Sequence, residues 1–410
     1  MAQELLFTQD QPAAQSEVEQ WGGRVVHKFG ETAFVAELPD SVDLADLTAS
    51  TAEPTHPLDE VTQLAVDAWA SSIEKRIEGA PPPGEGEQWD APGFEPPLEF
   101  DTASENAHAL DDEDDTAPAK ALATGVEELP AESTGTPTSE YLVGSVALGL
   151  VLVSRDTGDE EMTQAERIEI VREVQEGLDF LAGVEPRAKV SFVYDIRLIT
   201  VDSEPGPYDG AANAYERFER DWRDAALASM GFPAGRAGYQ QYAIDLRDRL
   251  DTDWAYVAFF TKYALNHFAY AIFEKVVMHY DNDGWGTASI NRVFAHESCH
   301  IFGAADEYGT CTCGGSHGKL GAPNDNCVNC FPPGAQVPCL MNRNTLEMCD
   351  SSRRQIGWGP ELFPQEAPSA GPLGSVTDAV GGVTDTVGGA TDTVRGATDK
   401  LLGGGEKQER

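Results

Sequence analysis

The chain of 410 residues carries 70 acidic and 28 basic side chains, a formal net charge of −42 at pH 7. Such a charge repels nucleic acid and anionic membrane surfaces, so we expect neither as a partner. Hydrophobic residues make up 41% of the chain, which is enough for globular domains with their own cores. The longest apolar run, residues 142–153, is too short to span a bilayer, and no secretory signal is visible. We therefore expect a soluble protein, either cytoplasmic or exported by a non-classical route.

Residues 1–78 are expected to form a small α/β domain. Two stretches on either side of Gly30-Glu31 contain alternating apolar residues, a pattern that predicts a β-hairpin. The expected elements are a strand at 5–7, a helix at 13–21, strands at 24–29 and 32–38, a short helix at 41–47 and an amphipathic helix at 58–77.

Part of this domain, EVEQWGGRVVHKFGETAFVAELPDSVDLADL, resembles the inhibitor-like propeptide domain of subtilisin-type proteases. The resemblance implies a small ferredoxin-like fold and a pro-segment role, so intramolecular inhibition by residues 1–78 is one expectation. Inhibition by a cysteine that ligates a metal is excluded, because no cysteine precedes Cys299.

Residues 79–140 differ in character from the segments on either side. Proline clusters and the acidic run at residues 111–115 dominate this stretch, which contains no arginine. Because such a segment buries little apolar surface, we expect a disordered linker and the main site of proteolytic nicking. It is either an activation site or only a tether.

Residues 141–362 are expected to form a second α/β domain. Thr163 and Glu166 have the spacing of a capping box, and a strand–helix–strand order predicts parallel pairing with a right-handed crossover. The expected elements are strands at 143–154, 189–201, 253–262 and 268–279, with helices after residue 163, through 215–227 and through 239–250.

A metal-binding pattern follows in the sequence HESCHIFGAADEY, residues 296–308. His296 and His300 are four apart, so on a helix both imidazoles reach a single ion. Glu297 can take a proton from a metal-bound water. Gly303 allows the chain to turn back, and Asp306 can then supply a third ligand. Three protein ligands with a position left for water are typical of catalytic Zn²⁺.

The extended pattern HExxHxxGxxD resembles the metzincin clan of zinc metallopeptidases, in its variant with aspartate as the third ligand. Cys339-Leu340-Met341-Asn342 fits the clan's methionine turn, with Met341 beneath the metal. The strings NDNC, VPCLMN and QIGW extend the likeness to bacterial metzincin-like metallopeptidases. The resemblance implies a mixed sheet that backs an active-site helix, followed by a Cys-rich C-terminal subdomain. Glu307, next to Asp306, is the rival third ligand.

Six of the seven cysteines lie between residues 311 and 349. They form three disulfides, hold a second metal, or remain free thiols; the residues are Cys311, Cys313, Cys327, Cys330, Cys339 and Cys349. Cys299, inside the metal pattern, is expected to be a small buried hydrophobe.

The C-terminal segment 363–410 is a Pro/Gly-rich tail that contains seven-residue repeats from Val376 onwards. Its apolar positions would form one stripe on a helix, but each glycine weakens that helix by about 1 kcal/mol. The tail is either a docking segment that orders on binding or a flexible low-complexity end.

Together these patterns predict a zinc-dependent endopeptidase that acts on a protein or peptide substrate. The alternative is a non-catalytic binding or effector module that keeps zinc for structure. A third interpretation is a structural surface protein that multimerises through its tail.

Overall fold

The centre of the fold is β5 (Ser145–Ser154), a strand buried along nearly its whole length. The computed structural model describes residues 1–78, 81–99, 137–204, 206–209, 211, 213–332 and 334–363, all within one compact unit, Met1–Pro364. A strand buried on both faces needs helices on both sides of its sheet. Aliphatic residues on both faces of β5 meet this requirement.

β5 pairs in parallel with β6 (Ser191–Thr200) on one side and with β7 (Trp254–Thr261) on the other. The predicted strand–helix–strand unit is confirmed, because α4 (Gln164–Val184) connects β5 to β6. The predicted capping box begins this helix. Thr163 Oγ1 accepts a hydrogen bond from the Glu166 amide, and the Glu166 carboxylate accepts one from the Thr163 amide.

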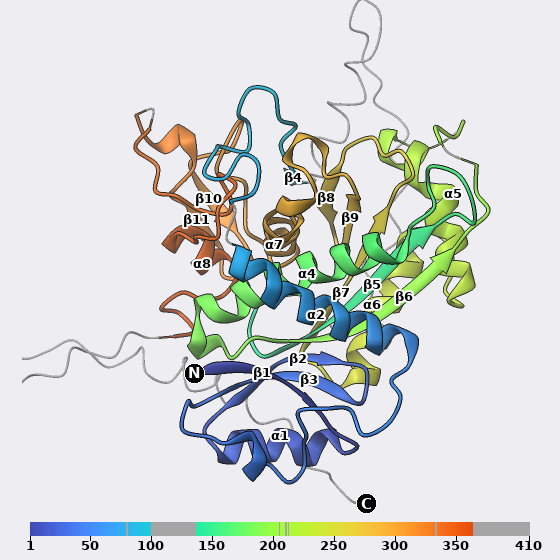
Figure 1. Cartoon of the computed structure of the whole chain (residues 1–410). Helices are drawn as coiled ribbons and strands as arrows, with labels where there is room; N and C mark the ends of the chain where they lie inside the picture. Colours follow the sequence, from blue (N-terminus) through green and yellow to red (C-terminus); the bar gives the residue numbers. More distant parts are fainter. Residues whose placement is uncertain are drawn as a thin grey trace, which may run out of the picture. The chain divides into compact units, whose positions relative to one another are not determined.

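Helices lie on both faces of the sheet around β5 (Figure 1), and alternate residues of the strand pack in two different cores. Leu148 and Leu150 belong to a core shared with α4 and α7, whereas Ala147 and Val151 pack with α5 and α6. The helices introduced here are α5 (Ala214–Ser229), α6 (Gly235–Leu250) and α7 (Ile290–Ile301). The described part of the chain is therefore a mixed α/β structure, with α7 fixed to one face of the sheet.

The N-terminal strands extend this same sheet. β2 (Arg24–Phe29) pairs antiparallel with β3 (Ala33–Leu38) and in parallel with β6, and β1 (Ala2–Phe7) pairs with β3 at the edge. The predicted hairpin is confirmed. α1 (Gln11–Gln20) packs on these strands through Ala14 and Val18. The short helix expected at 41–47 is only a 3₁₀ turn, Leu44–Asp46, because Leu47 takes an extended conformation and packs its side chain with Ala14 and Val18 of α1.

The helix expected at 58–77 is α2 (Glu60–Glu78), and it contacts α4 (Figure 1). The Gln175 side chain donates a hydrogen bond to the Ala65 carbonyl, and Lys75 Nζ lies 2.5 Å from the Glu173 carboxylate. Residues 1–78 are thus joined to the later segments by strand pairing and by helix packing.

The opposite edge of the sheet follows the order β7, β9, β8, β4 in the described residues. The single strand expected at 268–279 is a hairpin of β8 (Ala269–Ile272) and β9 (Lys275–His279). The chain reverses at Phe273, which takes the left-handed conformation with φ of 53°. This expectation fails because the run contains no glycine, proline or asparagine to indicate a turn.

Residues 81–99 were expected to belong to the disordered linker, but they are ordered and packed. Trp89 is fully buried, and β4 (Leu98–Glu99) pairs in parallel with β8. Aromatic anchors explain the difference, because Trp89 and Phe94 both contact Trp285. Residues 101–136 of the expected linker lie outside the described residues.

The segment after α7 is a loop-rich region that contains a two-stranded sheet and one short helix. The elements are β10 (Gly314–His317), β11 (Ala322–Asn324) and α8 (Asp350–Gln355). Two disulfides, Cys311–Cys327 and Cys313–Cys330, hold its first part together. The repeat tail lies outside the described residues. Among the described helices, none has the length and apolar character to cross a membrane.

Candidate metal centre

Helix α7 brings His296 and His300 together on one face. Their Nε2 atoms lie 2.9 Å apart, and the two rings are nearly perpendicular. The side chain of His296 is fully buried and that of His300 is 2% exposed. The four-residue spacing on a helix explains this arrangement, because successive turns place the two side chains one above the other.

Asp306 reaches the two histidines from the loop that follows the helix. Asp306 Oδ1 lies 3.2 Å from His296 Nε2 and 3.3 Å from His300 Nε2. The chain turns at Gly303, whose φ is +92°, and the Ala304 amide then bonds to the Cys299 carbonyl. These three side chains are the candidate ligands predicted from the sequence, and the structure brings them together.

The outward ring nitrogens of both histidines are held by backbone carbonyls. His296 Nδ1 lies 3.0 Å from the Leu340 carbonyl oxygen, and His300 Nδ1 lies 2.8 Å from that of Ala304. A hydrogen bond donated by Nδ1 makes Nε2 the nitrogen that can coordinate a metal. Both Nε2 atoms therefore point to the same place as Asp306 Oδ1.

The surroundings of this group favour a neutral His296 imidazole beside an ionised Asp306 carboxylate. Burial, with the charge of His300, lowers the pKa of His296. Burial alone would raise the pKa of Asp306, but His300 and His296 outweigh it and hold that pKa well below its usual range. Neutral imidazoles and a carboxylate are the protonation states that bind a divalent cation.

Glu297 is fully buried in α7, directly after the first histidine. Cys299 is also fully buried, as expected for a small core residue, and burial raises the pKa of its thiol. Both residues lie on the helix that carries the two histidines, so the position of each is fixed by the packing of α7 on the sheet.

The predicted turn at residues 339–342 is present beside the three side chains. The Asn342 amide bonds to the Cys339 carbonyl at 2.9 Å, and Met341 at its centre is fully buried. The Met341 carbonyl accepts a hydrogen bond from the Glu307 amide, while the Leu340 carbonyl faces His296. The turn therefore contacts both the helix and the loop that carry the candidate ligands.

Glu307 does not join the histidines. Its buried carboxylate turns towards the residues that follow Met341, with Oε2 accepting from Asn342 Nδ2 at 2.9 Å and Oε1 accepting from Ser352 Oγ at 2.7 Å. The side chains of Asn342 and Ser352, which bond to Glu307, therefore hold its carboxylate away from Asp306 and the histidines. In the described residues, the histidine group is completed by Asp306.

The cysteines divide into a disulfide-bonded set and a set of thiols, a division that the sequence did not decide. Cys311, Cys313, Cys327 and Cys330 are used in the two disulfides, so they do not form a four-thiolate metal site. Cys339 and Cys349 are buried thiols, as is Cys299. The spacing of the cysteines could not reveal this, because pairing depends on where the loop brings each one.

Residues 85–97 form a segment over this region that sequence reasoning missed. The Trp89 ring centroid lies 5.5 Å from that of His296, and Trp89 Nε1 donates to the Leu340 carbonyl at 2.6 Å. Tyr308 donates its hydroxyl hydrogen to the Pro97 carbonyl. The one available signal was the presence of isolated aromatic residues in an otherwise acidic, proline-rich stretch.

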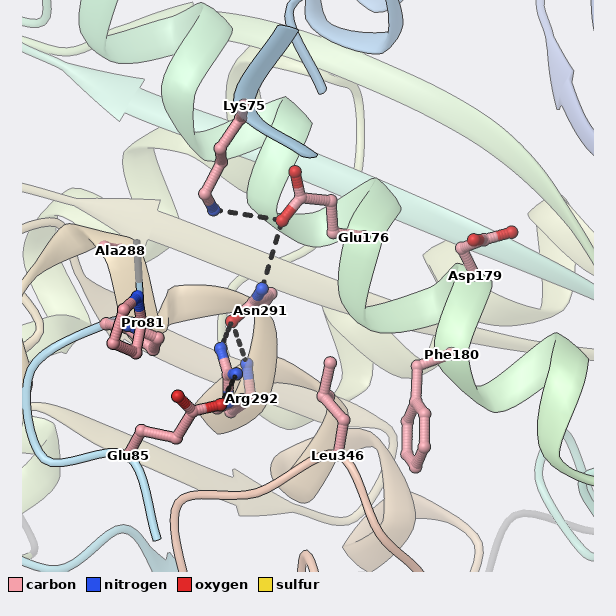
Figure 2. A pocket seen from close by; sticks show the side chains of 11 residues that line it. Lys75, Pro81, Glu85, Glu176, Asp179, Phe180, Ala288, Asn291, Arg292 and Leu346 are labelled. Carbon is pink, nitrogen blue, oxygen red and sulfur yellow. Dashed lines mark hydrogen bonds and ion pairs between the residues drawn. The ribbon is translucent and has the colours of Figure 1, made fainter. Parts of the chain in front are cut away.

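A cavity of about 420 Å³ lies between α2, α4, the start of α7 and residues 81–85 (Figure 2). A chain of polar contacts crosses it from Lys75 through Glu176 and Asn291 to Arg292, which pairs with Glu85 at 2.9 Å. None of the three candidate ligands lines this cavity.

Comparison with known proteins assigns the chain to no family. No protein-family model matches the sequence, and no curated protein matches it significantly.

Proposed function

We propose that the chain is a zinc-dependent endopeptidase and that His296, His300 and Asp306 hold the ion. The convergence of two imidazole Nε2 atoms and one carboxylate oxygen supports this proposal, with each pair of atoms 2.9 to 3.3 Å apart. Two neutral imidazoles and a carboxylate form a donor set that suits Zn²⁺ and leaves a coordination position for water. When bound, the ion would acidify that water and polarise a scissile carbonyl.

Glu297 is the proposed general base of this reaction. Its neighbour His296 is a candidate ligand, and the rigid helix that holds both residues limits how far the carboxylate can move. Glu297 accepts a proton from the attacking water and passes it to the leaving amine, so its role is proton transfer at a carboxylate oxygen. The Nδ1 atoms of His296 and His300 contact the backbone carbonyls of Leu340 and Ala304, which leaves each Nε2 directed at the proposed ion.

The metzincin likeness is part of the same proposal. Its supports are the helix with both histidines, the glycine turn to Asp306, and the buried Met341 in a turn that contacts His296 through Leu340. The ferredoxin-like likeness of residues 1–78 stays a proposal too. Its support is limited to three antiparallel strands with one helix on their outer face.

Intramolecular inhibition is proposed for the N-terminal part of the chain. Residues 1–78 were the expected inhibitor, but the contacts near the candidate ligands come from residues 81–99, through Trp89 and Pro97. β4 also covers the outer edge of β8, an edge at which an extended peptide could pair. A protease site inserted within residues 101–136 tests this proposal. Peptide cleavage should rise once the N-terminal fragment is separated from the cut protein, and unchanged cleavage after that separation would exclude inhibition.

The deciding experiment compares the full chain with Glu297→Gln and with a surface control, Glu19→Gln, all loaded with zinc. We expect only Glu297→Gln to lose cleavage of a mixed peptide library, by about 10²- to 10⁴-fold, while zinc content stays unchanged. If Glu297→Gln still cuts, the proposed mechanism is wrong. If zinc is bound and none of the proteins cuts, before or after linker cleavage, the non-catalytic zinc module becomes the better interpretation.

A further inference from the structure

We propose a second metal site on Glu307, Cys339 and Cys349, occupied by a structural divalent cation of the zinc class. It is distinct from the histidine group and does not depend on the proposed peptidase activity. One ligand atom from each residue lies within 4.8 Å of the other two. Glu307 and Cys339 are fully buried and Cys349 is 6% exposed.

The three side chains come from separate segments that meet in the folded chain. Glu307 lies in the loop after Asp306, Cys339 begins the turn around Met341, and Cys349 caps the start of α8. The four remaining cysteines of this region are used in disulfides, which leaves these two as its thiols. Two thiolates and a carboxylate are ligands that zinc sites use.

Backbone and side-chain donors surround these atoms as an outer layer. Cys339 Sγ accepts from the Cys349 amide at 3.3 Å, and Cys349 Sγ accepts from the Ser352 amide at 3.4 Å. Glu307 Oε2 accepts from Asn326 Nδ2 at 2.6 Å and from Asn342 Nδ2 at 2.9 Å. Donors of this kind orient metal ligands and stabilise their charged forms.

Glu307 Oε1 faces the sulfur atoms. It lies 2.8 Å from Cys349 Sγ and 2.7 Å from Ser352 Oγ. The partners of Oε1 are therefore a thiol and a hydroxyl, whereas the amide groups hold Oε2. A cation that replaces the thiol hydrogen would use Oε1 and leave the Asn326 and Asn342 bonds in place.

The exchange balances in charge and atoms. One dication enters, the two thiols release two protons, and the formal charge of the cluster does not change. In a tetrahedral site, ligand oxygen and sulfur are about 3.5 Å apart, so Glu307 Oε1 and Cys349 Sγ must separate by roughly 0.7 Å. Ser352 Oγ lies 3.4 Å from Cys339 Sγ and 3.5 Å from Cys349 Sγ, close enough to supply the fourth ligand.

A cation here would also support the histidine group. Glu307 directly follows Asp306, and Cys339 directly precedes Leu340, whose carbonyl contacts His296. Fixing Glu307 and Cys339 through one ion would restrain both the loop and the turn. Loss of this ion should therefore weaken metal binding at the histidine group by about 10- to 100-fold, the usual effect of losing supporting contacts.

Cobalt titration of the metal-free full chain tests the proposal. Co²⁺ bound by thiolates gives a sulfur-to-metal charge-transfer band in the near ultraviolet, which a site made of histidine and aspartate cannot give. We expect two cobalt ions per chain and this band in the wild type. The band should persist in His296→Ala/His300→Ala and in Cys299→Ala, and disappear in Cys339→Ser/Cys349→Ser.

Glu307→Gln is a second variant in case the double cysteine variant does not fold. It keeps both thiols and the size of the side chain but removes the negative charge. A weaker cobalt affinity, measured from the intensity of the charge-transfer band, would support the proposal. A single cobalt ion with no charge-transfer band in the wild type would overturn it. So would finding one free thiol, instead of three, in the unfolded unreduced chain, because Cys339 and Cys349 would then form a disulfide.

Discussion

His296 Nδ1 lies 3.0 Å from the carbonyl oxygen of Leu340, a residue 44 positions further along the chain. The same carbonyl accepts a second hydrogen bond from Trp89 Nε1 at 2.6 Å. One backbone oxygen thus links the helix of the candidate metal centre, the turn around Met341 and the segment 85–97. The first prediction addresses this junction.

Trp89→Phe should destabilise the protein, because it removes one donor from the buried Leu340 carbonyl and leaves a small void. We expect a loss of about 1–3 kcal/mol in the free energy of unfolding, measured by urea denaturation. Trp21→Phe is the matched control, since Trp21 is 42% exposed and its replacement should be nearly neutral. Equal effects of the two substitutions would show that the Trp89 contact contributes nothing specific.

Asp306→Asn should lose zinc, whereas Asp202→Asn should not. The substitution at Asp306 removes the anionic oxygen that faces both histidines, while Asp202 carries a side chain that is 99% exposed. Zinc content after dialysis against a weak chelator measures the difference. Full zinc retention by Asp306→Asn would exclude Asp306 as a required ligand. Another residue of the loop would then have to supply the third ligand.

Gly303→Ala should damage the candidate metal centre more than Gly231→Ala damages its own turn. Both glycines have positive φ, +92° and +88°, so an added side chain costs about 1–2 kcal/mol at either position. At Gly303 the new Cβ would also lie 2.4 Å from Gly318 Cα, whereas nothing lies within 4 Å at Gly231. We therefore expect the larger fall in unfolding free energy, and weaker zinc binding, only for Gly303→Ala. Equal losses of unfolding free energy in the two variants would show that the loop moves away from the new side chain with no further loss of stability.

Glu185 should make stability depend on acid pH. The Arg187 side chain, with Arg353 on α8, lowers the pKa of Glu185 to about 2 although burial opposes the shift. A carboxyl with a depressed folded pKa stabilises the fold above its unfolded pKa, and this contribution is lost as pH falls towards the folded pKa. The relevant pH window therefore runs from 4.5, the ordinary pKa of a glutamate, down to about 2.

Thermal unfolding of the wild type and of Glu185→Gln across this window tests the prediction. At pH 6 the wild type should be more stable by about 1.5–3 kcal/mol, the usual range for a hydrogen bond to a charged group. The two proteins should converge as pH approaches 2. A stability difference that stays constant over the whole pH window would show that it comes from packing of the side chain and not from its charge.

Several elements could be predicted from the sequence because their causes are local. The capping box at Thr163 and the period of apolar residues after it indicated α4, and the four-residue spacing of His296 and His300 fixed their shared face on α7. A run of aliphatic and β-branched residues indicated β5. In each case the signal lies within a few residues, where backbone geometry alone determines which side chains are neighbours.

Other features depended on contacts between distant segments, and no local pattern contained them. The separation of Asp306 from Glu307 was decided by Asn342 and Ser352, which reach Glu307 from more than thirty residues away. The burial of Trp89 was decided by Trp285 and Leu340. Likewise, the division of the cysteines into disulfides and buried thiols followed the path of the loop. The residue types along the chain indicate which side chains are able to bind a metal. Contacts between distant segments set which of these side chains lie close together, because packing fixes distances that spacing along the chain does not.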